Sequence, residues 1–157
     1  MYFCYHSSPL GTLRLAGTEG ALHQLFFPNA FAVGEAPDDW TYQEEPFTLV
    51  RQQLDAYFGG KLKHFELDLA PSGTPFQRDV LKALQQIPYG ETRAYSDIAT
   101  HIGRPKAVRA VGAANGRNPI AIIIPCHRVI GRDGSLTGFG GGLKSKQLLL
   151  NLEADHS

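Results

Sequence analysis

The stretch TPFQRDVLKALQQIPYGETRAYSDIATHIGRPKAVRAVGAANG, residues 74–116, decides the fold class of this chain. It opens with Thr-Pro-Phe-Gln, the signature of a capped helix start with proline at the first helical position. Two shorter helices are predicted after it, over residues 96–102 with Ser96 as the cap and over residues 106–115. Two helices joined by a glycine turn with basic residues around it are typical of a helix-turn-helix, although helical hairpins in protein cores have the same spacing. The second half of the chain is therefore predicted to be mainly helical.

The residues before this stretch alternate between strand and turn patterns. The predicted strands cover residues 2–6, 12–17, 21–27 and 64–69. A helix is predicted over residues 46–58, where apolar side chains recur at helical spacing before a Gly-Gly pair. The fold class is therefore α+β, with a small N-terminal sheet-plus-helix domain (residues 1–70) followed by a mainly helical C-terminal domain with a helix-turn-helix (residues 71–157).

Basic side chains are concentrated in the second half, although the formal net charge of the chain is 0. Residues 1–73 carry 4 Lys and Arg against 9 Asp and Glu, whereas residues 74–157 carry 11 against 6. A local positive excess attracts phosphate groups even when an acidic half keeps the whole molecule neutral. The alternative is a solvated basic face that binds nothing.

The second helix of the predicted pair is slim on one side. Its small side chains are Ala107, Ala110 and Ala114. Val108 and Val111 are expected to face the core, and Arg109 is the long side chain that can reach outward. The slim side predicts close approach to DNA or tight packing against a neighbouring helix.

The composition indicates a protein that stays inside the cell. No run of eighteen apolar residues occurs, so no membrane-spanning helix is predicted. The N-terminus lacks the basic and apolar segments of a secretory signal. The cysteines are Cys4 and Cys126, and nothing in the sequence calls for a disulfide between them. We expect a cytoplasmic protein with reduced thiols.

The chemical signal lies in the stretch IAIIIPCHR, residues 120–128. The apolar run before the proline predicts a strand buried on both faces. Cys126 then stands beside His127 and Arg128, and positive neighbours favour the reactive thiolate over the thiol. Because adjacent side chains on an extended chain point apart, a water or a sharp turn is needed to connect His127 to the sulfur. Glu153, in a predicted terminal helix, is the candidate for the group that orients the imidazole.

The stretch NPIAIIIPCHRV, residues 118–129, resembles the active-site segment of the O6-alkylguanine-DNA alkyltransferases, also called methylated-DNA–protein-cysteine methyltransferases. The similarity runs from Thr74 to Glu153, and the N-terminal part agrees only in its general pattern. The resemblance implies a single-turnover repair protein that flips O6-alkylguanine, and also O4-alkylthymine, out of duplex DNA and transfers the alkyl group to Cys126.

The resemblance also implies roles for the residues around the acceptor. His127, a water and Glu153 would form the relay that makes Cys126 a thiolate. Asn118 would tie the second helix to the active-site strand, and Lys146 would support the site.

The resemblance places the second helix in the minor groove of DNA. Tyr95 would hydrogen-bond the guanine and help to swing it out, and Arg109 would fill the gap that the base leaves. The residues expected at DNA are Tyr95, Ala107, Arg109, Ala110, Ala114 and Arg128.

Two features depart from the commonest pattern of the family. Phe139 stands where a tyrosine is frequent, so a hydroxyl contact is lost there. Some relatives bind zinc in the N-terminal domain, but Cys4, His6 and His23 are too few for a four-ligand site. We therefore predict no metal and no other cofactor. The expected partner is double-stranded DNA containing O6-alkylguanine, without a membrane or an obligate protein partner.

Three other functions are compatible with parts of the sequence. A lesion sensor would flip damaged bases without repairing them, but such proteins lack the acceptor cysteine, which is present here. A helix-turn-helix regulator would carry an inert cysteine. A cysteine hydrolase would turn over an ester and would have no use for the basic helix pair.

Overall fold

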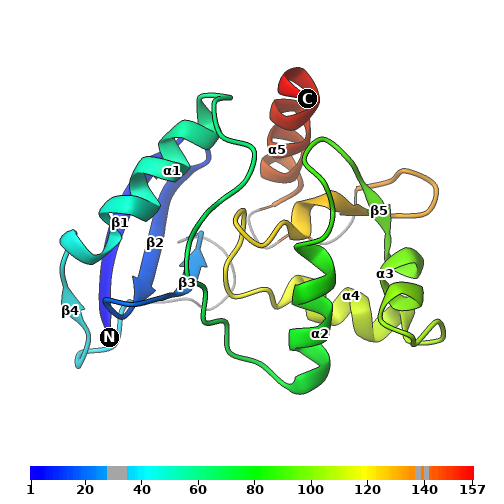
Figure 1. Cartoon of the computed structure of the whole chain (residues 1–157), viewed down its shortest axis with the longest axis horizontal. Coiled ribbons are helices and arrows are strands. Elements are labelled where there is room, and N and C mark those ends of the chain that lie inside the picture. Colours follow the sequence, from blue (N-terminus) through cyan, green and yellow to red (C-terminus); the bar gives the residue numbers. More distant parts are fainter. Residues whose placement is uncertain (28–34, 137–138, 140–141) are drawn as a thin grey trace.

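A four-stranded sheet and helix α1 form the N-terminal part of the molecule (Figure 1). The computed structural model describes residues 1–27, 35–136, 139 and 142–157. The strands are β1 (Tyr2–Ser8), β2 (Gly11–Gly17), β3 (Leu22–Phe26) and β4 (Thr41–Tyr42), in the order β3-β2-β1-β4. β1, β2 and β3 pair antiparallel, and β4 pairs parallel to β1. A 3-10 turn, η1 (Glu45–Phe47), leads into α1 (Thr48–Phe58), which lies across one face of the sheet.

The C-terminal part is mainly helical, as predicted. Its elements are α2 (Pro75–Leu84), β5 (Arg93–Ala94), α3 (Tyr95–His101), α4 (Val108–Gly116), η2 (Cys126–Arg128), β6 (Val129–Ile130) and α5 (Leu143–His156). The cap before α2 is confirmed, because Thr74 Oγ1 accepts from the Gln77 N–H at 3.2 Å while Gln77 Oε1 accepts from the Thr74 N–H at 2.9 Å. The predicted Ser96 cap is wrong. The cap residue is Ala94, two residues earlier, and its N–H donates to Asp97 Oδ2 at 2.8 Å.

Two predicted strands are absent as strands. In residues 64–69 only Leu69 pairs, with Leu22, because the Gln53 side chain takes both backbone groups of Glu66 at 2.9 and 3.1 Å. Residues 120–124 are buried but turn back on themselves, and only the first of them bridges to the sheet, through Leu25. A continuous run of buried apolar residues occurs both in strands and in packed loops, so the sequence pattern could not distinguish the two structures.

Helix α4 packs against α2 and α3 with a face that differs from the predicted one. Val111, Ala114 and Asn115 are buried, whereas Val108, in the first turn, is 37% exposed. Ala114 is therefore a core residue, and its assignment to DNA is wrong. The slim side of the helix was predicted either to approach DNA or to pack against a neighbouring helix. Ala114 is packed in the core, whereas Ala110 is exposed.

The two parts share one hydrophobic core, to which Leu13 and Tyr57 contribute from the first part and Leu84, Ile120 and Leu149 from the second. The sheet-plus-helix part and the helical part agree with the predicted α+β class. The boundary between residues 70 and 71 stays a prediction. Among the described residues, no helix is both long and apolar enough to cross a membrane.

Candidate active site

Cys126 begins the short helical turn η2 and is 5% exposed. Its N–H donates to the Ile124 carbonyl at 2.8 Å, so the chain makes a sharp turn at the cysteine instead of leaving a strand. The Ile122 backbone, with a φ of 71°, adopts the left-handed conformation, which is unusual for a β-branched residue. This turn removes the geometric objection that Cys126 and His127 would point to opposite sides of an extended chain.

Two asparagines hold the loop on either side of the proline that precedes the cysteine. Asn118 Nδ2 donates to the Ile124 carbonyl at 2.7 Å, and its Oδ1 accepts from the Ile120 N–H at 3.0 Å. Asn115, from the buried face of α4, donates to the Cys126 carbonyl at 3.4 Å. Asn118 was predicted from the sequence, whereas Asn115 was not. A polar residue on the inward face of a helix, three positions before Asn118, was the available signal.

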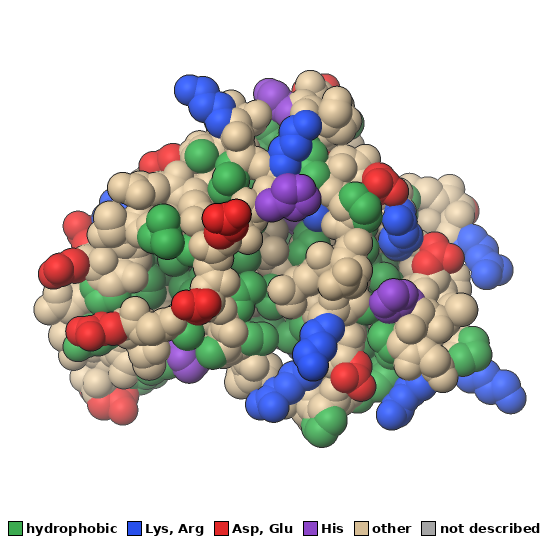
Figure 2. Space-filling view, in the orientation of Figure 1, with side chains coloured by type: hydrophobic (Ala, Val, Ile, Leu, Met, Phe, Trp, Pro, Cys, Tyr) green, Lys and Arg blue, Asp and Glu red, His purple; other side chains and the backbone are tan. Residues whose placement is uncertain are grey.

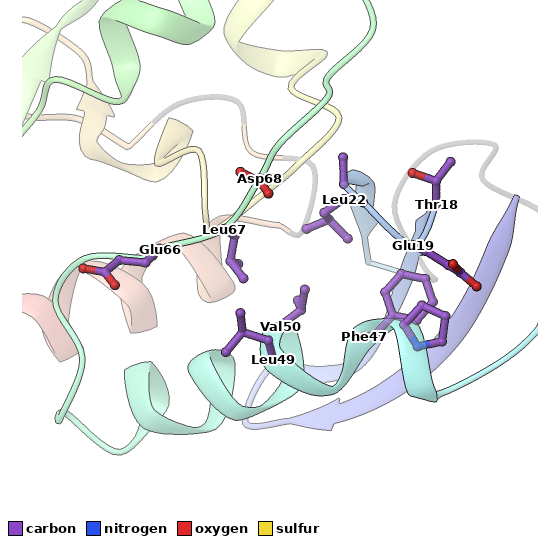
Figure 3. A pocket seen from close by; sticks show the side chains of 12 residues that line it. Thr18, Glu19, Leu22, Phe47, Leu49, Val50, Glu66, Leu67 and Asp68 are labelled. Atoms are coloured by element: carbon purple, nitrogen blue, oxygen red, sulfur yellow. The ribbon is translucent and has the colours of Figure 1, made fainter.

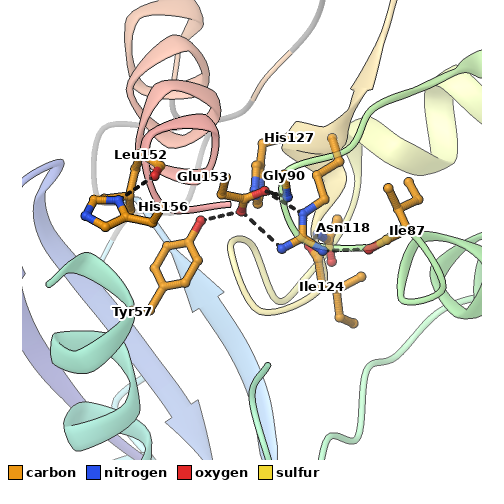
Figure 4. Close-up of polar contacts among 10 residues, drawn as sticks. Tyr57, Ile87, Gly90, Asn118, Ile124, His127, Leu152, Glu153 and His156 are labelled. Atoms are coloured by element: carbon orange, nitrogen blue, oxygen red, sulfur yellow. Dashed lines mark hydrogen bonds and ion pairs between the residues drawn. The ribbon is translucent and has the colours of Figure 1, made fainter. Parts of the chain in front are cut away.

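His127 and Glu153 form a buried pair at 0% and 1% exposure (Figure 4). Nε2 of His127 lies 2.6 Å from Oε2 of Glu153. Because the carboxylate is an acceptor, the imidazole carries its proton on Nε2 and presents Nδ1 as an acceptor. Nδ1 has no hydrogen-bond partner among the described residues. Burial lowers the pKa of His127, so the imidazole is neutral at rest.

Glu153 is also bound by Arg128 through a fork. Nε donates to Oε1 at 2.7 Å, Nη2 donates to Oε2 at 3.1 Å, and Nη1 donates to the Ile87 carbonyl at 2.6 Å. Burial raises the pKa of Glu153, but hydrogen bonds from His127 and Arg128 outweigh it and lower that pKa to about 2. The predicted contact of Arg128 with DNA is wrong, because this side chain is buried at 7% exposure and committed to Glu153. Arg128 instead stabilises the ionised form of the Glu153 carboxylate.

Tyr57 is a site residue that was not predicted from the sequence. It counted only as part of the apolar face of the helix over residues 46–58, yet its hydroxyl donates to Oε2 of Glu153 at 2.6 Å. No local pattern could have revealed this contact, because the partners lie 96 positions apart.

The pKa of the Cys126 thiol differs from the sequence-based expectation that basic neighbours would favour the thiolate. Burial raises the pKa of Cys126, whereas the Asn118 hydrogen bond and the charge of Lys146 act to lower it. Lys146 is buried in α5 and donates to the Val129 carbonyl at 2.6 Å. Lys146, not Arg128, is therefore the cation that acts on the sulfur. The net rise in pKa leaves a protonated thiol at rest, which needs a base to become a nucleophile.

The comparisons with known proteins agree with this arrangement. Residues 75–155 match the family described as "6-O-methylguanine DNA methyltransferase, DNA binding domain", and residues 1–71 match "6-O-methylguanine DNA methyltransferase, ribonuclease-like domain". The chain belongs to this family. The resemblance found in residues 118–129 is thereby confirmed, and the chain is a methyltransferase.

Individual relatives are similar over nearly the whole length. A methylated-DNA–protein-cysteine methyltransferase of Methanosarcina acetivorans is 54% identical over 153 residues, which is 98% of each chain. The one from Mycobacterium tuberculosis is 51% identical over 146 residues, or 93% of this chain and 88% of the relative. The crystal structure of M. tuberculosis OGT in complex with DNA superposes with a TM-score of 0.94 at 48% identity, covering 100% of this chain and 95% of that one.

The surface charge of the methyltransferase is divided between its two parts. Figure 2 shows acidic side chains gathered over the N-terminal elements at the left, and Lys and Arg side chains gathered over the helical part at the right. Arg109 and Ala110 of α4 are exposed, and Ala107 is half-buried just before the helix. The Tyr95 ring lies against Gly112 of α4, where an added Cβ would be 3.9 Å from Cδ1 of the tyrosine. Helix α4 thus contacts both Tyr95 and the Cys126 loop.

A hollow of about 470 Å³ lies on the N-terminal part, between α1, the β2–β3 turn and residues 66–68 (Figure 3). Leu22, Leu49 and Leu67 line it, together with the acidic Glu66 and Asp68. It contains none of the predicted site residues, and its acidic side chains would repel phosphate.

The remaining expectations concern Phe139 and metals. The Phe139 ring packs edge-on against the Phe27 ring, with a centroid distance of 5.6 Å. Across the described part of the chain, no three His, Cys, Asp or Glu side chains gather as metal ligands would. His6 instead bonds Asp55 at 2.8 Å.

Proposed function

We propose that this methyltransferase repairs duplex DNA by transferring the alkyl group of O6-alkylguanine, and of O4-alkylthymine, to Cys126 in a single turnover. The observation that carries the proposal is the buried thiol beside a neutral imidazole whose free nitrogen accepts and whose other nitrogen is bound to Glu153. This is the arrangement of a nucleophile, a base and an orienting group.

Displacement at an alkyl carbon requires the thiolate, because the protonated thiol is a poor nucleophile. Nδ1 of His127 takes the thiol proton, directly or through a bridging water, and Glu153 stabilises the imidazolium that forms. The sulfur then forms the S–C bond while the O6–C bond breaks, and that electron pair stays on the guanine. The thiol proton ends on the released base. A thioether has no good leaving group, so each molecule reacts once.

Two further residues serve this step: Asn118 holds the Cys126 loop in place, and Lys146 supplies a positive charge near the sulfur. The hydrogen bonds of Asn118 to the backbone on both sides of Ile122 support the first role. The effect of Lys146 on the pKa of Cys126 supports the second.

The target base must leave the duplex, at a cost of a few kcal/mol, before the sulfur can reach its alkyl group. We propose that α3 and α4 act as a helix-turn-helix, with the exposed, slim side of α4 at Ala107 and Ala110 in the minor groove. Arg109 fills the gap in the base stack, and the Tyr95 hydroxyl donates to the base as negative charge develops on it.

The decisive test is the intact mass of the protein after incubation with a duplex containing O6-methylguanine. Wild type and Cys4→Ala should each gain one methyl group, and Cys126→Ser should gain none. A lesion sensor or a regulator would bind the duplex without the mass gain, and a hydrolase would turn over an ester. Methyl transfer that survives in Cys126→Ser, or a label mapped to Cys4, would refute the assignment. A cytoplasmic location and independence from a protein partner stay predictions.

A further inference from the structure

Tyr57 brings the N-terminal part of the molecule into the relay. It lies in α1, its side chain is 0% exposed, and its hydroxyl reaches Oε2 of Glu153 at 2.6 Å. Figure 4 shows the phenol approaching the carboxylate from α1, while His127 and Gly90 lie on the other side. The hydrogen bond therefore joins the sheet-and-helix part to the group that orients the imidazole.

The oxygen that Tyr57 binds is the one that the relay uses. Oε2 of Glu153 accepts from His127 at 2.6 Å and from Arg128 at 3.1 Å, in addition to the phenol. Oε1 accepts from Arg128 at 2.7 Å and from the Gly90 N–H at 3.4 Å. Arginine and phenol thus hold the carboxylate from two sides, so Oε2 cannot turn away from the imidazole without breaking a short hydrogen bond.

The phenol acts as a donor. Burial, reinforced by the neighbouring carboxylate, raises the pKa of Tyr57, so the hydroxyl keeps its proton through the neutral and moderately alkaline range. An ionised carboxylate has only acceptors and gains from each donor that approaches it. The ring has a separate role, since it packs against Phe65 at a centroid distance of 5.3 Å. Tyr57→Phe therefore removes the donor and keeps the packing.

We propose that Tyr57 is a positioning residue for alkyl transfer, holding Glu153 where its carboxylate stabilises protonated His127 while the Cys126 thiolate forms. The inference rests on the proposed function of Cys126. Without the phenol, the carboxylate holds the imidazolium less well, and the thiolate forms at a higher pH. The titratable and charged groups that surround this relay are Tyr57 from α1, Tyr89 from the turn after α2, Cys126, His127 and Arg128 from η2, and Lys146 from α5.

The test compares wild type with Tyr57→Phe, both in a Cys4→Ala background that leaves one thiol. Transfer from free O6-benzylguanine should slow about tenfold at neutral pH, as expected for the loss of a hydrogen bond to a charged group. The rising limb of the pH–rate profile should move to higher pH, and the deficit should shrink as the pH rises. Alkylation of Cys126 by iodoacetamide, followed by intact mass, should show the same shift. This second readout needs no DNA chemistry, so it tests the inference even if alkyl transfer itself fails.

The matched control is Tyr89→Phe, which removes a hydroxyl from the same aromatic cluster. The Tyr89 hydroxyl is buried and has no partner among the described residues, and its ring lies 6.3 Å from that of Tyr57. This variant should keep the wild-type rate and pH profile. A Tyr57→Phe deficit that is equal at every pH, or an iodoacetamide profile identical to wild type, would show that Tyr57 serves folding alone and would overturn the proposal.

Discussion

Glu153 is the residue that decides the electrostatics of the site. Its carboxylate is buried and accepts hydrogen bonds from His127, Arg128 and Tyr57. An unpaired buried charge costs several kcal/mol, so Arg128 is committed to this carboxylate. Arg128 is therefore not available to DNA, whereas Arg109 of α4 is exposed.

Arg109 is expected to act on the duplex and not on the bond that breaks. We predict that Arg109→Ala slows repair of duplex DNA by at least about tenfold, because an extruded base costs a few kcal/mol to hold out of the stack. Reaction with free O6-benzylguanine should stay at the wild-type rate. Single-turnover kinetics on both substrates, with the exposed Lys82→Ala of α2 as the control, measure the difference. An equal loss on both substrates would contradict the prediction.

At the scale of elements, the segment between α4 and η2 is positioned by asparagine side chains and by a single backbone bridge to Leu25. Asn115 and Asn118 bind carbonyl groups on either side of the proline before Cys126. The left-handed backbone at Ile122 is unfavourable by itself and persists because these contacts hold it. The Cys126 loop is therefore tied directly to helix α4 through Asn115.

Asn118→Ala should lower both stability and reactivity. The change leaves the buried Ile120 N–H without its partner, at about 1–3 kcal/mol, and removes one of the two donors to the Ile124 carbonyl. We expect the free energy of unfolding to fall by roughly 1–3 kcal/mol and transfer to slow on the free base as well as on the duplex. Urea denaturation and single-turnover kinetics check this.

The matched control for Asn118 is Asn151→Ala, an exposed position of α5 where the side chain accepts from Gln147 at 2.8 Å. It should change neither quantity. Wild-type stability in Asn118→Ala would show that the loop does not depend on this asparagine.

At the scale of the whole molecule, α5 touches both parts. Its last turn packs against Gly60 after α1 and against Gly90 after α2, and at both glycines the φ is positive. A side chain at position 60 would meet the His156 ring, and one at position 90 would meet the Ser157 side chain. Together with the shared core and the Tyr57–Glu153 bond, this contact makes the relay dependent on how the two parts are assembled.

From these buried ionisable groups we predict that the free energy of unfolding falls at acidic pH. The folded pKa of His127 is lowered, so the unfolded chain binds a proton first as the pH drops below about 6.5, and stability declines from there. The pKa of Glu153 falls from 4.5 to about 2, so its contribution is complete above pH 4.5 and is lost between 4.5 and 2. That contribution amounts to about 3 kcal/mol.

Urea denaturation of wild type and Glu153→Gln at a series of pH values measures the effect. The gap between the two free energies of unfolding should be widest near neutrality and should narrow as the pH falls below about 4.5. Asp155→Asn, at an exposed position of the same helix, should show no such gap. A Glu153→Gln gap that is constant with pH would mean that the carboxylate is not ionised in the folded protein.

The sequence by itself determined the family, the element types of the N-terminal hairpins and of α1 and α2, and the candidate residues Cys126, His127 and Glu153. These depend on local causes. A capping box, a glycine turn or alternating apolar residues act between neighbours along the chain, so they are readable without the fold.

Only the tertiary structure decided what the buried polar groups bind. Arg128 and Ala114 turn inward, Lys146 supplies the charge near the sulfur, and Tyr57 joins the relay from a distant helix. Burial and pairing are set by which segments meet across the core, and a buried charge must find its partner there, however far apart the two lie in the chain.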